Sequence, residues 1–134
     1  MSTTKILAER YEVGELLGYG GMAEVRLARD TRLGRDVAVK ILRSDLARDQ
    51  TFQARFRREG QSAAALNHQA IVAVYDTGTD PSTTPPTPFI VMEYVEGQTL
   101  RDLLRSKGRL EPHEAMRIVA EMCAALDFSH RGGI

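Results

Sequence analysis

The spacing of apolar residues changes at Gly97, and this change constrains the fold more than any other feature of the sequence. Before Gly97, short apolar runs alternate with turn residues, which is typical of strands, whereas after it apolar residues recur at helical spacing. One stretch of helical spacing interrupts the strands, at Phe52, Phe56, Ala63 and Leu66. The strand-like runs are 11–17, 24–29, 37–42, 71–75 and 89–94. The first three are joined by short turns and predict an antiparallel meander.

These runs predict an α+β fold, with a five-stranded antiparallel sheet, one long helix and an all-helical part that follows. The expected boundaries are a tail over 1–8, a sheet-bearing part over 9–95 and a helical part over 96–134. Four prolines predict an exposed, mobile loop between the last two strands, namely Pro81, Pro85, Pro86 and Pro88.

The helical part carries its own start and stop signals. Thr99 and Asp102 have capping-box spacing, and Gly108 is placed to end a short helix. Pro112 is suited to the first turn of a second helix, whose apolar stripe runs until Gly132. Two helices are therefore expected after Gly97.

Composition excludes several classes of protein. The 134 residues hold 18 Lys and Arg against 18 Asp and Glu, and 43% of them are hydrophobic, which is typical of a soluble globular protein. That balance argues against a nucleic-acid partner. The single Cys123 allows no internal disulfide, and no run of apolar residues is long enough for a membrane segment. A cytoplasmic location is expected.

A glycine-rich loop at Gly18 to Val25 is the first candidate for chemistry. Glycines let backbone N–H groups approach phosphate oxygens without interference from a side chain. The alternative is a hairpin turn that needs glycine for a positive φ. A Rossmann loop would run into a helix, whereas a strand is predicted here, and no Gly-Lys-Ser/Thr triplet of a Walker A loop occurs. A dinucleotide enzyme is excluded if residues 22–29 form a strand.

Lys40 and Glu59 form the second candidate. On a strand, alternate residues share a face, so Lys40 shares one face with the small Ala38, and the other face carries Val37, Val39 and Ile41. Glu59 falls on the apolar stripe of the predicted helix, where a carboxylate is costly unless a cation meets it. Lys40 is the nearest such cation in strand context. The alternatives are a solvent-facing lysine of an edge strand and a glutamate at the margin of the stripe.

Other residues carry weaker signals. The strand end from Met92 to Gly97 leaves backbone groups free to bond the edge of a heterocycle, although it also fits a plain linker. No histidine has partners at metal spacing. A solvated helix surface is the expectation for three arginines, Arg55, Arg57 and Arg58.

Taken in order, several of these motifs together resemble a eukaryotic-type protein kinase, over its amino-terminal lobe, its hinge and the first helices of its large lobe. They are Gly18-x-Gly20, Val25, Val37-Ala38-Val39-Lys40, Glu59 and Met92 to Gly97. Runs such as GGMAEV, DVAVK, RFRRE and AIVAVYDTG are similar to bacterial serine/threonine kinases of the PknB type. The resemblance covers residues 9–134, which is the amino-terminal part of a kinase domain.

The resemblance implies ATP and protein substrates as partners, with Lys40 and Glu59 as catalytic residues. Lys40 would hold the α- and β-phosphates, and Glu59 would hold Lys40 in place. The glycine loop would cover the triphosphate with Gly18, Tyr19, Gly20, Gly21, Met22, Ala23, Glu24 and Val25. Adenine would contact Leu17, Val25 and Ala38, with Met92 as gatekeeper and the backbone of Glu93, Tyr94 and Val95 at its edge.

Further implications concern what this sequence does not contain. The third loop glycine of the family is Ala23 here, and the family's His-Arg-Asp, Asp-Phe-Gly and Ala-Pro-Glu motifs do not occur. The ligands of Mg²⁺ would lie beyond Ile134, so this chain alone is expected to be inactive. A non-catalytic nucleotide- or partner-binding module is the alternative. A homodimer through the amino-terminal lobe is also expected, and relatives often carry a membrane anchor.

Two expectations concern stability. Gly60 inside the predicted helix should cost about 1 kcal/mol relative to alanine, in exchange for a movable helix. The last helix should dock loosely and leave its apolar stripe exposed.

Overall fold

The computed structural model of the chain describes residues 4–134, which form two compact units. The sheet unit comprises residues 4–65 and 73–94, and the helical unit comprises residues 66–72 and 95–134. The change in apolar spacing at Gly97 lies close to the second junction. The short segment 66–72 belongs to the helical unit although it lies, in the sequence, between two parts of the sheet unit.

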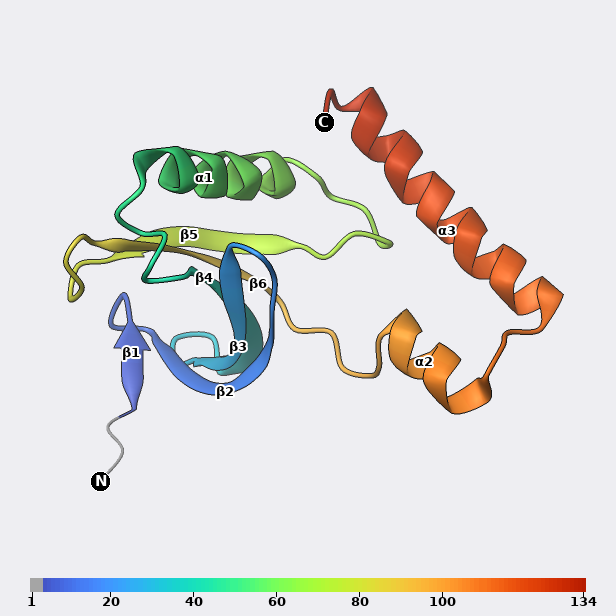
Figure 1. The fold of residues 1–134 in the computed structure, drawn as a ribbon, viewed down its shortest axis with the longest axis horizontal. Helices are drawn as coiled ribbons and strands as arrows, with labels where there is room; N and C mark the ends of the chain where they lie inside the picture. The colour runs from blue at the N-terminus through green and yellow to red at the C-terminus, as the bar shows by residue number, and fades with distance from the viewer. Residues whose placement is uncertain (1–3) are drawn as a thin grey trace. The chain divides into compact units, whose positions relative to one another are not determined.

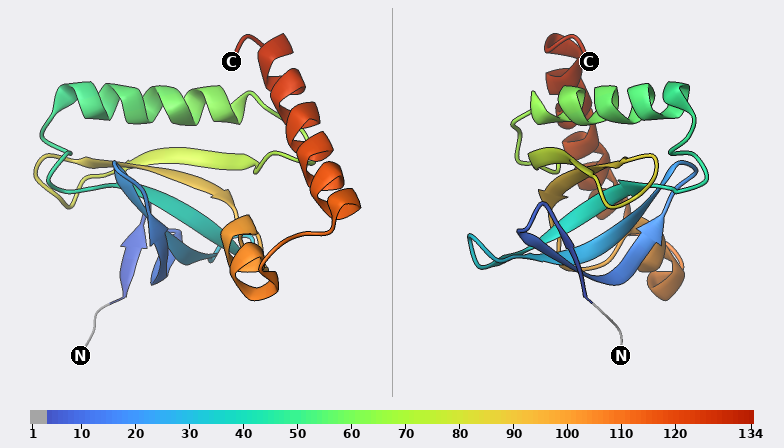
Figure 2. Two further views of the ribbon diagram at one scale, coloured as in Figure 1. Left: turned by 45° about the vertical axis from the view of Figure 1, so that its right-hand side comes forward. Right: turned by 90° about the vertical axis from the view of Figure 1, so that its left-hand side faces the viewer.

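The sheet unit is built on one six-stranded antiparallel sheet with the order β1-β2-β3-β4-β6-β5 (Figure 1). The strands are β1 (Lys5–Leu7), β2 (Tyr11–Tyr19), β3 (Ala23–Asp30), β4 (Arg35–Leu42), β5 (Val74–Asp80) and β6 (Thr87–Glu93). Strands β2, β3 and β4 form the predicted meander. Two register shifts in β2, on either side of Leu16, accompany the strong bend of this strand seen in Figure 2.

The mixed α and β architecture is confirmed, but the sheet has six strands and not five. Lys5–Leu7 was expected in the tail, yet it pairs with β2 and buries Leu7 in the core. Three residues are too few to show a strand alternation. Because residues 23–30 form a strand after the glycine loop, the dinucleotide-enzyme alternative is excluded.

The last two strands are displaced from their expected positions. The fifth strand begins at Val74, later than predicted, and continues to Asp80. Its second half consists of polar residues and glycine, which do not show the apolar alternation of a strand. The sixth begins at Thr87, so Pro88 is a buried strand residue and not part of the loop. Two hydrogen bonds stabilise the start of the loop, where Asp80 accepts from the backbone N–H and the hydroxyl of Ser82.

Helix α1 (Gln50–Ala64) is the long helix predicted from the apolar stripe, and it packs against β5 and β6 (Figure 1). Asp49 caps it by accepting a 2.8 Å hydrogen bond from the N–H of Thr51. Gly60 is buried, and a β-carbon there would lie 3.0 Å from Cδ1 of Ile90. The structure therefore gives Gly60 a role that was not foreseen: it permits the close approach of α1 to the sheet.

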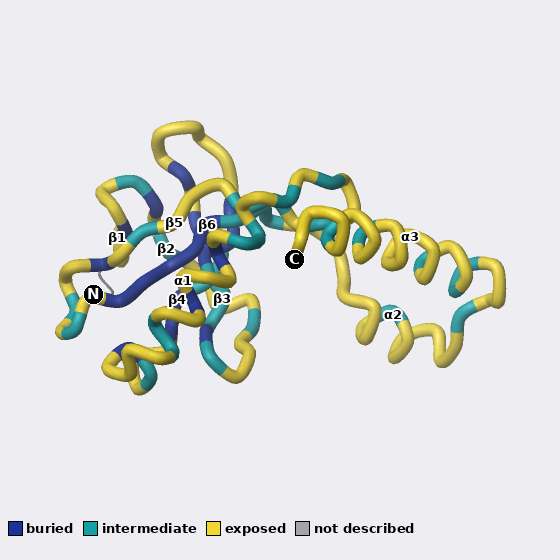
Figure 3. The backbone as a smooth tube through the Cα atoms, turned by 90° about the horizontal axis from the view of Figure 1, so that it is seen from above, coloured by how far each residue is buried: buried dark blue, intermediate teal, exposed yellow. Residues whose placement is uncertain are grey.

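Two buried clusters lie on opposite faces of β4. One contains Val37, Val39 and Ile41, together with Leu7, Tyr11, Ala28, Phe89 and Val91. The other joins the sheet to α1 and contains Ala23, Leu42, Ala47, Phe56 and Ile90. Figure 3 shows that the buried backbone is concentrated in the strands.

The helical unit contains α2 (Leu100–Lys107) and α3 (Pro112–Arg131). The predicted capping box of α2 is present, with hydrogen bonds of 3.1 and 3.2 Å between Thr99 and Asp102, and Gly108 ends the helix with φ 80°. Neither helix has a buried residue, and the exposed apolar side chains of α3 include Met116, Val119, Met122 and Leu126. Within residues 4–134, no helix has the length and apolarity that crossing a bilayer requires.

Candidate phosphate-binding site

Lys40 lies on the face of β4 that the alternation predicted. In the antiparallel register it stands opposite Val25 of β3 and Ile90 of β6, while Ala38 stands opposite Leu27 and Met92. Residues opposite one another share a face of the sheet. Lys40 and Ala38 therefore share one face with Val25, and the buried valines of β4 occupy the other.

Glu59 of α1 meets Lys40 directly, with 2.5 Å between Nζ and Oε1. The pairing follows from the packing of α1, because the neighbouring Gly60 touches Ile90, which is the cross-strand neighbour of Lys40. The side chains of Lys40 and Glu59 are 25% and 46% exposed. A pair this accessible stabilises a fold by only about 0–1 kcal/mol, so its main effect is to fix the position of the ammonium group.

The glycine loop closes the end of the β2–β3 hairpin without needing glycine for its backbone. The N–H of Gly20 donates to the carbonyl of Ala23 at 2.9 Å, and the N–H of Arg43 donates to the carbonyl of Met22 at 3.0 Å. Gly18, Gly20 and Gly21 all lack a positive φ, and a β-carbon on any of them would meet no atom within 4 Å. The hairpin alternative based on positive φ is therefore wrong, and the missing side chains leave open space.

A cavity of about 380 Å³ occupies this space between the glycine loop and α1. Its lining consists of Gly20, Gly21, Met22, Ala23, Lys40, Phe52 and Arg55. Two cations and a turn of small residues thus surround one volume, which suits a polyanion.

Arg55 and Phe52 are the lining residues that sequence reasoning missed. Arg55 was expected on a solvated surface, and Phe52 was assigned only to the apolar stripe. A signal was present in the spacing, because Phe52, Arg55 and Glu59 are three and four residues apart and so share one face of the helix.

The residues predicted to hold adenine are only partly brought together. Ala38 is 6% exposed and stands opposite Met92, which is half-buried. The N–H of Glu93 is already used, since it donates to the carbonyl of Ala73 at 2.8 Å. Leu17 is 42% exposed at the bulge of β2, and Val95 is 61% exposed and belongs to the helical unit.

Three further predicted residues lie away from the cavity. Tyr19 is 75% exposed, and the carboxylate of Glu24 accepts a 3.0 Å hydrogen bond from Arg26. Tyr94, half-buried, ends the sheet unit and is not among the lining residues. The loop backbone from Gly20 to Ala23 is thus the part of the predicted loop that faces the cavity.

Metal ligands are a separate matter. Within residues 4–134, no three His, Cys, Asp or Glu side chains are grouped so that they could hold a metal ion.

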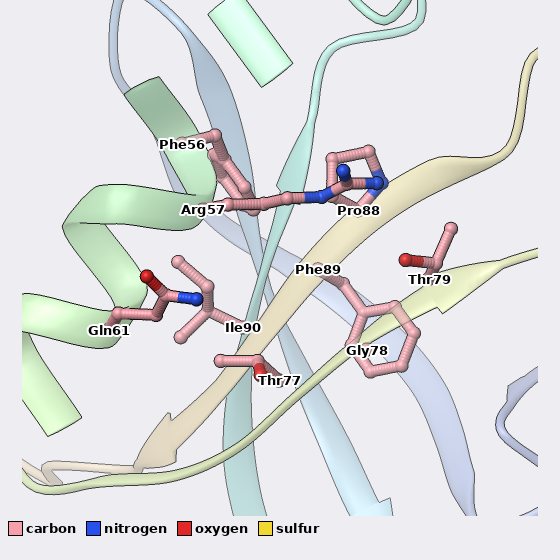
Figure 4. A pocket seen from close by; sticks show the side chains of 9 residues that line it. All are labelled: Phe56, Arg57, Gln61, Thr77, Gly78, Thr79, Pro88, Phe89 and Ile90. Atoms are coloured by element: carbon pink, nitrogen blue, oxygen red, sulfur yellow. The ribbon is translucent and has the colours of Figure 1, made fainter. Parts of the chain in front are cut away.

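A second cavity, of about 120 Å³, lies between α1 and strands β5 and β6 (Figure 4). Its lining consists of Phe56, Arg57, Gln61, Thr77, Gly78, Thr79, Pro88, Phe89 and Ile90. None of the predicted site residues contributes to it. Nucleotide binding is not expected in this second cavity.

Comparison with known proteins places these features in a family. The profile described as protein kinase domain matches residues 11–134. Over 134 residues the chain is 60% identical to "Serine/threonine-protein kinase PknB" of Mycobacterium tuberculosis and 61% identical to that of Mycolicibacterium smegmatis. Each alignment covers 100% of this chain and 21% of the relative. The chain thus spans about a fifth of the length of these curated relatives.

A solved structure agrees. The crystal structure of the Mycobacterium tuberculosis PknI kinase domain superimposes with a TM-score of 0.78 at 30% sequence identity. The match covers 100% of this chain and 53% of that one.

Proposed function

The chain belongs to the protein kinase family, and we propose that its sheet unit binds the phosphates of ATP in the cavity beneath the glycine loop. The complete protein would transfer the γ-phosphate of ATP to serine or threonine side chains of protein substrates. The 134 residues by themselves would bind nucleotide without transferring phosphate.

The ion pair between Lys40 and Glu59 is the observation that carries this proposal. It fixes an ammonium group at the edge of a cavity that is also lined by the glycine loop and by Phe52 and Arg55 of α1. Charge-assisted hydrogen bonds from such a group to phosphate oxygens are about twice as strong as neutral ones. Because Glu59 holds Lys40 before nucleotide arrives, little reorganisation is needed on binding.

Each residue has a distinct part in the proposed complex. Lys40 would contact the α- and β-phosphates, and Glu59 would position Lys40 without contacting the nucleotide. Free N–H groups of the loop would approach phosphate oxygens, although the N–H of Gly20 is taken by Ala23. Adenine would lie against Val25 and Ala38, which share the face of Lys40.

In this proposal Mg²⁺ would enter the cavity bound to the nucleotide. When bound to ATP, Mg²⁺ neutralises phosphate charge. The described residues contain no cluster of ligands for it. The motifs that supply a base and metal ligands in the family are absent from this sequence, which is why the proposal confines these residues to binding.

The remaining parts of the proposal concern partners and location. We propose protein substrates, a cytoplasmic location and self-association through the sheet unit, as the resemblance implies. Sedimentation velocity of the chain at increasing concentration tests the last point, and a single monomeric species throughout would contradict it.

Titration calorimetry with MgATP tests the binding proposal. Lys40→Met should weaken binding by about 10- to 100-fold, because hydrogen bonds to charged groups contribute about 1.5–3 kcal/mol. Lys107→Met is a matched control, since Lys107 also pairs with a glutamate, Glu114 at 3.2 Å, but does so in the helical unit. The control should bind like the wild type. No binding by the wild type, or equal binding by Lys40→Met, would contradict the proposal.

A further inference from the structure

Arg55 is a cation beside the glycine loop that the proposed function has not used. It lines the same cavity as Lys40, together with Gly20, Gly21 and Phe52. The two cations come from different elements, Lys40 from β4 and Arg55 from α1. The cavity therefore presents positive charge from two directions.

The charges of the two cations are not equally balanced. Lys40 is paired with Glu59 at 2.5 Å. In the part of the chain that the structure describes, no carboxylate lies within ion-pairing distance of Arg55. Glu59, four residues further along α1, would be its usual helical partner, but that carboxylate reaches Lys40 instead. The net positive charge of the cavity thus resides on Arg55.

The helix determines which of its arginines can act here. Arg55 lies four residues before Glu59, on the face that carries the ion pair, whereas Arg57 lines the second cavity beside β5 and β6. Arg58 is exposed and lines neither cavity. Only one of the three arginines of α1 is therefore placed to meet a ligand under the glycine loop.

We propose that Arg55 is a phosphate ligand that selects nucleoside triphosphates over monophosphates. The inference rests on the proposed function and assigns the terminal phosphate to Arg55, with the inner phosphates left to Lys40. A guanidinium offers paired N–H donors whose spacing matches two phosphate oxygens, and it stays charged at every relevant pH. The open space at Gly20 and Gly21 leaves room for the outermost phosphate.

The ratio of ATP to AMP affinity measures this selection. Titration calorimetry on the 134-residue chain, with MgATP and with AMP as probes, gives the ratio for wild type, Arg55→Ala, Arg55→Lys and Arg58→Ala. Arg55→Ala should lower the ratio by about ten-fold or more, the equivalent of one charge-assisted hydrogen bond. Arg55→Lys should retain part of it, since the charge remains but the paired donors are lost. Arg58→Ala should match the wild type.

Two results would overturn the assignment. One is an unchanged ratio in Arg55→Ala, and the other is an equal fall in Arg58→Ala, which would indicate a general field of the helix. Far-UV circular dichroism of each variant identifies any that has not folded. If Arg55→Ala does not fold, the ATP-to-AMP ratio of Arg55→Lys, which is the milder change, tests the assignment. If wild type binds ATP but the ratio is insensitive to Arg55, only this inference fails. If wild type binds neither nucleotide, the proposed function fails with it.

Discussion

Gly78 lies opposite Phe89 in the pairing of β5 with β6, and the ring of Phe89 occupies the place of the missing side chain (Figure 4). A β-carbon at position 78 would lie 2.6 Å from Cζ of this ring and 3.1 Å from both Cε atoms. The ring is 2% exposed and meets the ring of Tyr11 edge-on, with centroids 6.4 Å apart. It cannot move aside without disturbing the core.

We therefore expect Gly78→Ala to destabilise the sheet unit. Overpacking a core typically costs about 1–3 kcal/mol, and replacing a strand glycine returns about 0.5–1 kcal/mol, so the midpoints of the two ranges give a net loss of about 1 kcal/mol. Phe89→Leu removes the atoms that clash. The double variant should therefore lose about 1 kcal/mol less stability than the sum of the losses in the two single variants.

Urea unfolding measures these differences. The chain has no tryptophan, and its four tyrosines, at positions 11, 19, 75 and 94, all lie in the sheet unit, so tyrosine fluorescence reports that unit alone. Gly18→Ala is the matched control, because Gly18 is also a strand glycine but has no atom within 4 Å of its would-be side chain. The control should be as stable as the wild type or slightly more so. Wild-type stability in Gly78→Ala, or strict additivity in the double variant, would refute the reasoning.

In the same urea assay, Gly60→Ala should raise the free energy of unfolding by less than the roughly 1 kcal/mol expected from helix propensity, because the new β-carbon would lie 3.0 Å from a core side chain. An increase of the full ~1 kcal/mol would contradict this close packing. Asp30→Asn should lower the thermal midpoint at neutral pH but not in strong acid. The guanidinium of Arg10, 2.7 Å away, holds the pKa of Asp30 well below its usual range, so its stabilisation is complete above about pH 4 and is lost as pH falls further. Equal thermal midpoints of Asp30→Asn and the wild type at neutral pH would contradict this stabilisation by Asp30. In alkali, stability should fall from about pH 10 upward, because burial and the hydrogen bond to Asp76 raise the pKa of Tyr11 to about 12. Tyr11→Phe should remove that fall in thermal scans, and a persistent fall would exclude Tyr11 as its source.

The sequence predicted features that are determined by residues a few positions apart, such as the face of a strand or the cap of a helix. Alternation over β4 placed Lys40 and Ala38 on one face because strand side chains alternate strictly. The capping box of α2 followed from two residues three positions apart. The pairing of Lys40 with Glu59 was predictable because a carboxylate on an apolar stripe needs a cation.

The features that the sequence did not reveal depend on contacts between distant segments. The role of Gly60 depends on Ile90, thirty residues away, which no pattern around the helix identifies. Strand β1 is recognisable only through its pairing with β2. The spacing of Arg55 and Glu59 places them on one helix face, but only the packing of α1 brings that face beside the glycine loop.

Nuclear magnetic resonance of the isotope-labelled chain, with and without MgATP, tests the central claim most directly, because it reports where the ligand binds. The account predicts shifts in the amide signals of Gly20 to Ala23 and of Lys40, and much smaller shifts in Lys40→Met. Shifts concentrated instead at the second cavity, around Gly78 and Phe89, or none at saturating nucleotide, would contradict it.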